Sequence, residues 1–166
     1  MKRLFSTLII LLVVSPVASQ PRSYTIQNNE LKTGIEVVFK AGTDILDVSS
    51  DPPLHEVKSY LTDKKAITLL RIEAHVAAGG DENKNLGLTK KRALAVAKWL
   101  VQIGVDSSRI IAVAFGSAKP IADNGVPEGK MLNTRISFVN AAMLKHPIGA
   151  MPVDVGGVVV CNPCSF

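Results

Sequence analysis

The sequence has few of the side chains that build metal sites, redox centres and base-stacking surfaces. It contains two cysteines and three histidines in 166 residues, and aromatic residues make up 5%. His55, His75 and His146 lack the spacing of metal ligands, so we expect no metal and no cofactor. The formal net charge is +5, a mild excess without a polybasic tract. With so few aromatic residues, nucleic acid is not an expected partner.

The two cysteines form a C-x-x-C pair, Cys161 and Cys164, close to the end of the sequence. A redox-active pair normally opens a helix directly after a strand, where the helix dipole lowers the thiol pKa. This pair instead follows Gly156-Gly157. A structural disulfide is therefore favoured over a thiol oxidoreductase. No Ser-His-Asp order, paired acidic site or phosphate-binding loop stands out either, so we expect no enzyme.

Long apolar runs are missing except at the start of the sequence. Lys2 and Arg3 precede the apolar run 4–14, which Ser15-Pro16 and the small residues 17–19 follow. This order is typical of a secretory signal peptide, predicted to cover residues 1–19. The run falls short of the roughly 20 residues that span a bilayer, so no transmembrane segment is expected after cleavage. Export would place the cysteines in an oxidising compartment.

The remainder reads as one domain in which strands alternate with helices. Strands are predicted at 34–40, 66–76, 109–115 and 135–140, a short helix after Ser49-Ser50-Asp51, and a long helix over 89–103. This pattern indicates an α/β (α+β) two-layer fold, with two helices covering one side of a sheet of about four strands. The predicted organisation is a polar segment at 20–32, the domain at 33–142 and an irregular tail at 143–166.

Arg92 stands out on the predicted long helix. At about 100° per residue it shares the apolar stripe with Val96, Trp99 and Ile103, so its side chain is expected to face inward. A helix starting at residue 89 would also place this cation in the first turn, where it opposes the helix dipole. A structural salt bridge, a side chain that snorkels toward solvent, or a bound anion would each satisfy such an arginine.

Several motifs occur in the order found in one family. They are Ile72-Glu73-Ala74-His75, Asn85-Leu86-Gly87-Leu88-Thr89-Lys90-Lys91-Arg92-Ala93, Gly104-Val105, Pro120-Ile121-Ala122-Asp123-Asn124 and Asn133-Thr134-Arg135-Ile136. From about Ile35 to Phe138 the chain resembles the OmpA-like peptidoglycan-binding domain. The resemblance implies a βαβαβ-type mixed sheet with helices on one side. It also implies non-covalent binding to the peptide stem of the cell wall.

In that family an aspartate and an arginine bind the amino acid head of diaminopimelate as a pair. The arginine of a Leu-Ser-x-x-Arg-Ala motif takes the carboxylate. Leu88, Thr89 and Arg92 match that motif, with Thr89 in place of serine, and Asn85 matches the family's loop asparagine. The resemblance therefore makes Arg92 the predicted carboxylate ligand.

The other half of the family site is altered. Gly-His-Thr-Asp has become Ala74-His75-Val76-Ala77, so Ala77 stands where the aspartate takes the ammonium. Asp81, further along the loop, is a possible substitute. The Asn-Arg-Arg motif keeps only its second arginine, Arg135.

The resemblance implies a non-catalytic protein of the periplasm or outer membrane, with two functions left open. One is binding of the peptidoglycan stem, weakly or with altered specificity. The alternative is an interaction or structural subunit of an envelope complex that no longer binds the wall.

Overall fold

A computed structural model describes residues 24–149, 156–164 and 166. The predicted signal peptide, residues 1–19, lies outside this range. The strands are β1 (Thr25–Gln27), β2 (Glu30–Lys32), β3 (Ile67–His75), β4 (Ile110–Gly116), β5 (Ile136–Met143), β6 (His146–Pro147) and β7 (Val158–Cys161). The helices are α1 (Asp51–Asp63), α2 (Glu82–Gln102) and α3 (Pro127–Asn133), with short 3-10 turns at Val48–Ser50 and Ser107–Arg109.

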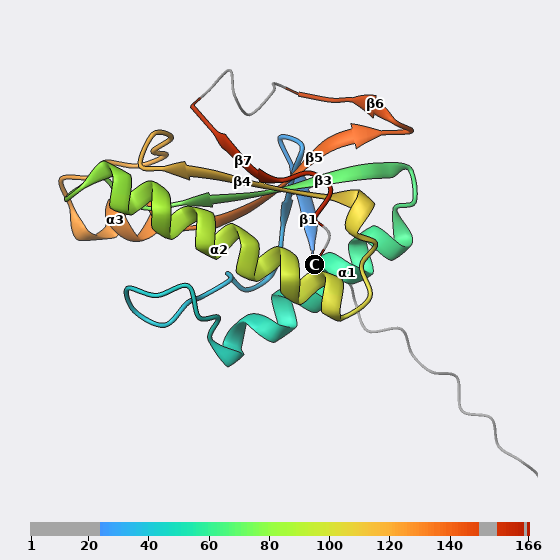
Figure 1. Ribbon diagram of the computed structural model, residues 1–166, viewed down its shortest axis with the longest axis horizontal. Helices are drawn as coiled ribbons and strands as arrows, with labels where there is room; N and C mark the ends of the chain where they lie inside the picture. Colours follow the sequence, from blue (N-terminus) through green and yellow to red (C-terminus); the bar gives the residue numbers. More distant parts are fainter. Residues whose placement is uncertain (1–23, 150–155, 165) are drawn as a thin grey trace, which may run out of the picture.

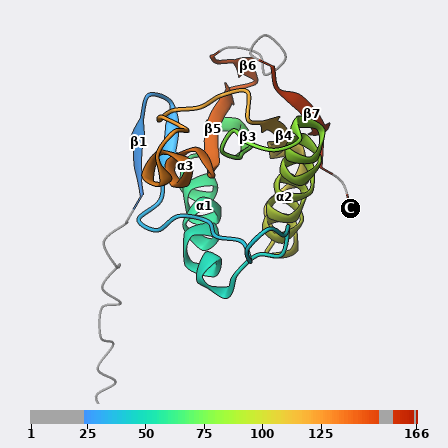
Figure 2. The ribbon, with the colours of Figure 1, turned by 90° about the vertical axis from the view of Figure 1, so that its left-hand side faces the viewer.

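The strands form one mixed sheet in the order β1-β2-β5-β3-β4-β7, and β6 pairs with the outer end of β5. Only β3 and β4 run parallel, with α2 as the connection between them. Figures 1 and 2 show α1 and α2 lying side by side on the same face of the sheet. The two-layer α/β prediction is confirmed.

The main core lies between this helix layer and the sheet. Fully buried aliphatic side chains come from every layer, for example Leu54 on α1, Ile72 on β3, Leu100 on α2 and Ile110 on β4. Burial of side chains of this size stabilises the fold by about 1.5–3 kcal/mol each. The opposite sheet face carries a smaller apolar cluster of Ile111, Val113 and Phe115. None of the helices in the described ranges combines the length and apolarity needed to cross a membrane.

The long helix begins earlier than predicted. Asp81 is the N-cap of α2, and its side chain accepts a hydrogen bond from the backbone N of Lys84. Helix α2 therefore begins at Glu82 and not near residue 89. Arg92 lies in the middle of α2, so the predicted opposition to the helix dipole does not apply.

The predicted strand at 34–40 is wrong. This segment has only one isolated bridge, between Phe39 and Leu46. The backbone of Val38 is instead held by the side chain of Ser50, which accepts from Val38 N and donates to Val38 O. In Figure 2 the cyan segment runs from the β1–β2 hairpin toward α2 and then turns back to α1. The alternating apolar residues therefore line a loop.

The segments before and after the predicted domain also differ from the prediction. The polar segment 20–32 contains a hairpin, β1–β2, whose second strand pairs with β5 and buries Leu31. The tail beyond residue 142 is not wholly irregular, because β6 pairs with β5 and β7 pairs with β4. Cys161 and Cys164 form the predicted disulfide, and Cys164 is fully buried. The sheet therefore extends beyond both predicted domain boundaries.

Candidate functional site

A pocket of about 650 Å³ opens between the loop 36–42, helix α3 and the start of β5. Most of its wall is apolar, contributed by Val37, Val38, Phe39, Met131, Leu132 and Ile136. Four charged residues also line it: Arg92, Arg135, Glu36 and Glu128. Two of the predicted site residues, the two arginines, thus meet in one pocket although they are far apart in the sequence.

Arg92 reaches this pocket from the middle of α2. The residue is 7% exposed, which confirms the predicted inward orientation. Its Nε donates to the carbonyl oxygen of Thr43 at 2.9 Å, and its guanidinium lies 4.7 Å from the ring centroid of Phe39. Burial lowers the pKa of Arg92, while the charge of Asp44 raises it. The Nε hydrogen bond and the contact with the Phe39 ring together fix the position of the side chain.

No carboxylate oxygen of the described residues lies within 4.0 Å of the Arg92 guanidinium. The structural salt bridge, one of the explanations for an inward arginine, is thus absent from the described part of the chain. A charged guanidinium held by neutral groups at the wall of a pocket is suited to receive an external anion.

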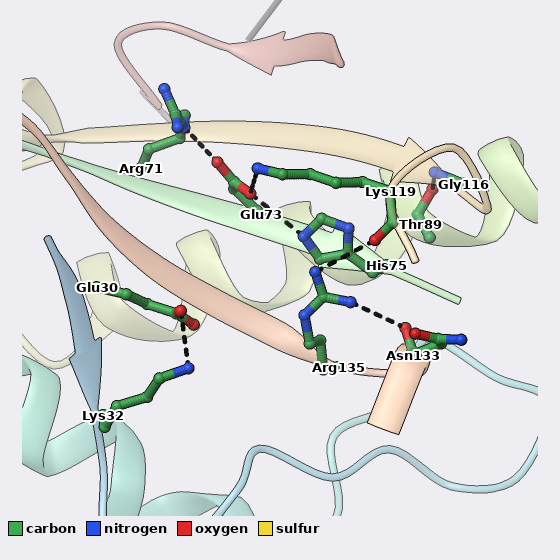
Figure 3. A network of polar contacts seen from close by, with 10 residues as sticks. All are labelled: Glu30, Lys32, Arg71, Glu73, His75, Thr89, Gly116, Lys119, Asn133 and Arg135. Atoms are coloured by element: carbon green, nitrogen blue, oxygen red, sulfur yellow. Dashed lines mark hydrogen bonds and ion pairs between the residues drawn. The ribbon is translucent and has the colours of Figure 1, made fainter. Parts of the chain in front are cut away.

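Arg135 is half-buried and immediately precedes β5. Its two terminal nitrogens donate to the carbonyl oxygens of Asn133 and Lys119, both at 3.4 Å (Figure 3). Burial lowers the pKa of Arg135, and the charges of Glu30 and Glu73 raise it. Both donor contacts are long, so the guanidinium retains capacity for a stronger, charge-assisted partner.

Ala77 lies beside the pocket without lining it. Its backbone N donates to Oγ1 of Thr134 at 3.2 Å, and Thr134 is a pocket residue. Asp81, the possible substitute, lies at the start of α2, where its exposed carboxylate caps the helix. Among the described residues, the acidic ones that line the pocket are Glu36 and Glu128, both exposed at the rim.

Asn85, Leu88 and Thr89 support the site but do not line the pocket. Nδ2 of Asn85 donates to the carbonyl oxygen of Gly79, which holds the loop before α2. The buried hydroxyl of Thr89 lies within hydrogen-bond distance of the α2 carbonyls of residues 85 and 86, and accepts from Gly116 N at 3.1 Å. Leu88 is partly buried. Their contacts are structural ones.

A buried ionic network occupies the sheet face opposite α1 and α2. Glu73, 1% exposed, accepts from Arg71 Nε at 2.6 Å and from Lys119 Nζ at 3.2 Å (Figure 3). His75 Nε2 lies 3.3 Å from the same carboxylate. Burial and the charges of Arg135 and Lys119 lower the pKa of His75, although Glu73 raises it. The network thus places Arg71 and Lys119 around the carboxylate of Glu73. The charge of this carboxylate also acts on Arg135, one of the two arginines of the pocket.

Sequence reasoning missed Glu36, Glu128 and the apolar side chains of α3. The loop containing Glu36 was predicted as a strand, and no helix was predicted over the residues of α3. Pro127 at the first position of a helix, with Glu128 beside it, was the available signal for α3. No group of three or more His, Cys, Asp or Glu side chains within the described ranges could hold a metal ion.

Comparison with known proteins gives a consistent picture. The model of the OmpA family matches residues 38–134. The "Peptidoglycan-binding protein ArfA" of Mycobacterium tuberculosis is 37% identical over 91 residues, which cover 53% of this chain and 28% of that protein. The "Outer membrane porin F" of Pseudomonas aeruginosa is 32% identical over 127 residues, 70% of this chain and 35% of that protein. The chain thus matches about a third of the length of these curated relatives.

Solved structures share the fold. The peptidoglycan-associated lipoprotein of Burkholderia pseudomallei superposes with a TM-score of 0.54 at 27% sequence identity. The match covers 63% of this chain and 87% of the lipoprotein structure.

Proposed function

The chain belongs to the OmpA family, and we propose that it is a non-catalytic envelope protein that binds the peptide stem of peptidoglycan. The single observation that carries this proposal is Arg92, a nearly buried guanidinium at the wall of an open pocket with no carboxylate partner among the described residues. The names of the relatives point the same way, since one is a peptidoglycan-binding protein and another is a peptidoglycan-associated lipoprotein.

A ligand carboxylate would complete the contacts of Arg92. The fork of guanidinium N–H groups matches a carboxylate bidentately, and such charge-assisted bonds are about twice as strong as neutral ones. The apolar contact with Phe39 and the bond to Thr43 orient the fork before the ligand arrives. This pre-organisation lowers the entropy cost of binding. The stem of the wall is rich in carboxylates and methyl groups, which suits a pocket with cationic and apolar walls.

Binding is proposed to be weaker than in family members that keep the aspartate. Ala77 has no charge to offer to the ligand ammonium, and Asp81 caps α2. Losing one charged partner of a ligand pair commonly costs about 2–5 kcal/mol. The missing aspartate is also proposed to alter which stem peptides the protein prefers.

The disulfide also supports a non-catalytic role in the envelope. Cys161 and Cys164 are joined in a disulfide, and Cys164 is fully buried, so the pair does not present an accessible thiol. A disulfide of this kind persists in an oxidising compartment, which agrees with a periplasmic or outer-membrane-associated location.

Co-sedimentation of the protein with purified sacculi tests the proposal. Arg92→Ala is expected to reduce binding at least 30-fold, the lower end of the cost of losing a charged ligand partner. Lys91→Ala is the matched control, because it removes the same charge from the neighbouring exposed position of α2. Arg92→Lys keeps the charge but loses the bidentate fork, so it should fall between the two.

An interaction subunit that has lost wall binding would give a different result. In that case the unaltered protein would not sediment with sacculi, and Arg92→Ala would change nothing. Equal losses in Arg92→Ala and Lys91→Ala would instead show non-specific attraction to an anionic wall, and would contradict a role for the pocket.

A further inference from the structure

The charges of the pocket are distributed unevenly between its interior and its rim. Arg92 and Arg135, both partly or largely buried, supply two positive charges to the pocket wall. The acidic lining residues, Glu36 and Glu128, are solvent-exposed. Water screens charges at the rim far more than charges inside. Asp44, Glu30 and Glu73 also act on the two arginines, but none of them lines the pocket, so the buried charge of the pocket wall is that of the two guanidiniums.

A ligand that enters with an ammonium group would therefore be at a disadvantage. Two guanidiniums repel it, and burial removes its hydration. Ala77, whose backbone is hydrogen-bonded to the pocket residue Thr134, offers only a methyl group. Its neighbour Ala78 is likewise apolar. Among the described residues, no buried anion lines the pocket wall to compensate a ligand cation.

A ligand whose nitrogen is acylated avoids both the repulsion by the guanidiniums and the cost of burying a charge. An amide is neutral, so the guanidiniums do not repel it, and its acyl methyl group can contact apolar surface. The pocket offers such surface in Val38, Met131 and Leu132, all of which are exposed to solvent although they are large and apolar. The carboxylates of the same ligand remain available to Arg92 and Arg135.

We propose that the pocket selects stem peptides whose diaminopimelate amine is acylated, as it is in a cross-link, over stems that carry the free amine. The inference rests on the proposed function, because it assumes that the pocket binds the wall stem. It assigns the stem's carboxylates to the two arginines and the acyl group to the apolar wall formed by the loop 36–42 and α3. Ala77, which lies beside the pocket at the position of the family's aspartate, is the residue to which we assign this preference.

Two soluble probes test the preference by calorimetric titration. One is N-acetyl-L-alanyl-γ-D-glutamyl-meso-diaminopimelate with its side-chain amine free, and the other is the same tripeptide with that amine acetylated. The two probes differ only at this nitrogen. The acetylated probe is expected to bind about tenfold more tightly than the free amine.

Ala77→Asp should reverse the order of the two probes. The new carboxylate supplies the anion that an ammonium needs, so affinity for the free amine should rise at least tenfold, while the acetylated probe should gain nothing. Ala78→Asp is the matched control. It adds the same charge one residue further on, at an exposed position whose backbone N donates a hydrogen bond to Asn124. This variant should leave the order of the two probes unchanged. Circular dichroism and the melting temperature confirm that each variant is folded.

Arg135→Gln tests the second carboxylate contact. It should weaken both probes by a similar factor, since it acts on a group that both of them carry.

The outcomes separate this inference from the proposed function. If neither probe binds and sacculi are not bound either, the proposed function fails. If sacculi and both probes bind with equal affinity, or the free amine binds more tightly, the wall-binding function stands and the selectivity is refuted. A reversal in Ala78→Asp as large as that in Ala77→Asp would also overturn the role assigned to Ala77.

Discussion

Replacing Glu73 with glutamine tests the buried ionic network that reaches the pocket through Arg135. Burial alone would raise the pKa of Glu73, but the His75 contact and the charges of Arg71 and Lys119 outweigh burial and lower the pKa from 4.5 to about 2. One pKa unit corresponds to about 1.4 kcal/mol. The ionised carboxylate therefore stabilises the folded state by about 3 kcal/mol at neutral pH.

The sign of the pH dependence follows from the direction of the shift. The folded-state pKa lies below the unfolded one, so the stabilisation is fully present above pH 4.5 and is lost as the pH falls toward 2. Glu73→Gln should therefore lower the free energy of unfolding by about 3 kcal/mol at pH 7. The difference between the two proteins should shrink steadily between pH 4.5 and pH 2.

Urea unfolding at pH 7, 4 and 2.5 measures this difference. Glu36→Gln, at an exposed position, is the control and should stay within about 0.5 kcal/mol of the unaltered protein. The reasoning is refuted if Glu73→Gln is as stable as this control at pH 7. It is also refuted if the loss in Glu73→Gln is the same at every pH, because a pH-independent loss would reflect packing and not charge.

Three other substitutions probe the framework around the pocket. A Cβ at Gly129 would overlap the carbonyl oxygen of Asp123, so Gly129→Ala should destabilise the protein by about 1–3 kcal/mol in urea unfolding, since backbone cannot yield cheaply. Thr89→Val keeps the shape but leaves a buried backbone N–H at the end of β4 without its acceptor, and should cost about 1–3 kcal/mol by the same measurement. Replacing both Cys161 and Cys164 with serine should lower stability by about 2 kcal/mol, a value expected for a short closed loop, and unfolding of the unaltered protein with reductant should match it.

The sequence predicts the centre of the fold well because its signals there are strong. The apolar segments that became β3, β4 and β5 are bounded by turn residues, and Pro52-Pro53 after a serine pair marks the start of α1. The start of α2 was missed because Asn85 and Gly87 have low helix propensity. Its N-cap Asp81 was the available signal for the helix start, but the sequence also made this residue a candidate ligand.

Local patterns fail where tertiary contacts decide the structure. Val37 and Phe39 alternate as in a strand, yet they pack against the core from a loop whose backbone Ser50 holds. The three consecutive valines of β7 are a strand signal that the surrounding glycines and prolines obscured.

The candidate site, too, could be predicted only in part from local sequence patterns. The inward orientation of Arg92 follows from helical periodicity and is confirmed. Its meeting with Arg135 in one pocket depends on how the loop 36–42, α3 and β5 pack together, which no local pattern encodes. The rim carboxylates Glu36 and Glu128 were missed for the same reason.

An amide NMR titration of the folded protein with the acetylated stem tripeptide tests directly whether the stem binds at Arg92. We expect the shift changes to cluster at Thr43, Thr134 and Arg135 and on the turn of α2 that carries Arg92. Arg92→Ala should abolish these changes, while Lys91→Ala should not. Changes confined to the far edge of the sheet at β7, or a pattern that persists in Arg92→Ala, would contradict binding of the stem at Arg92.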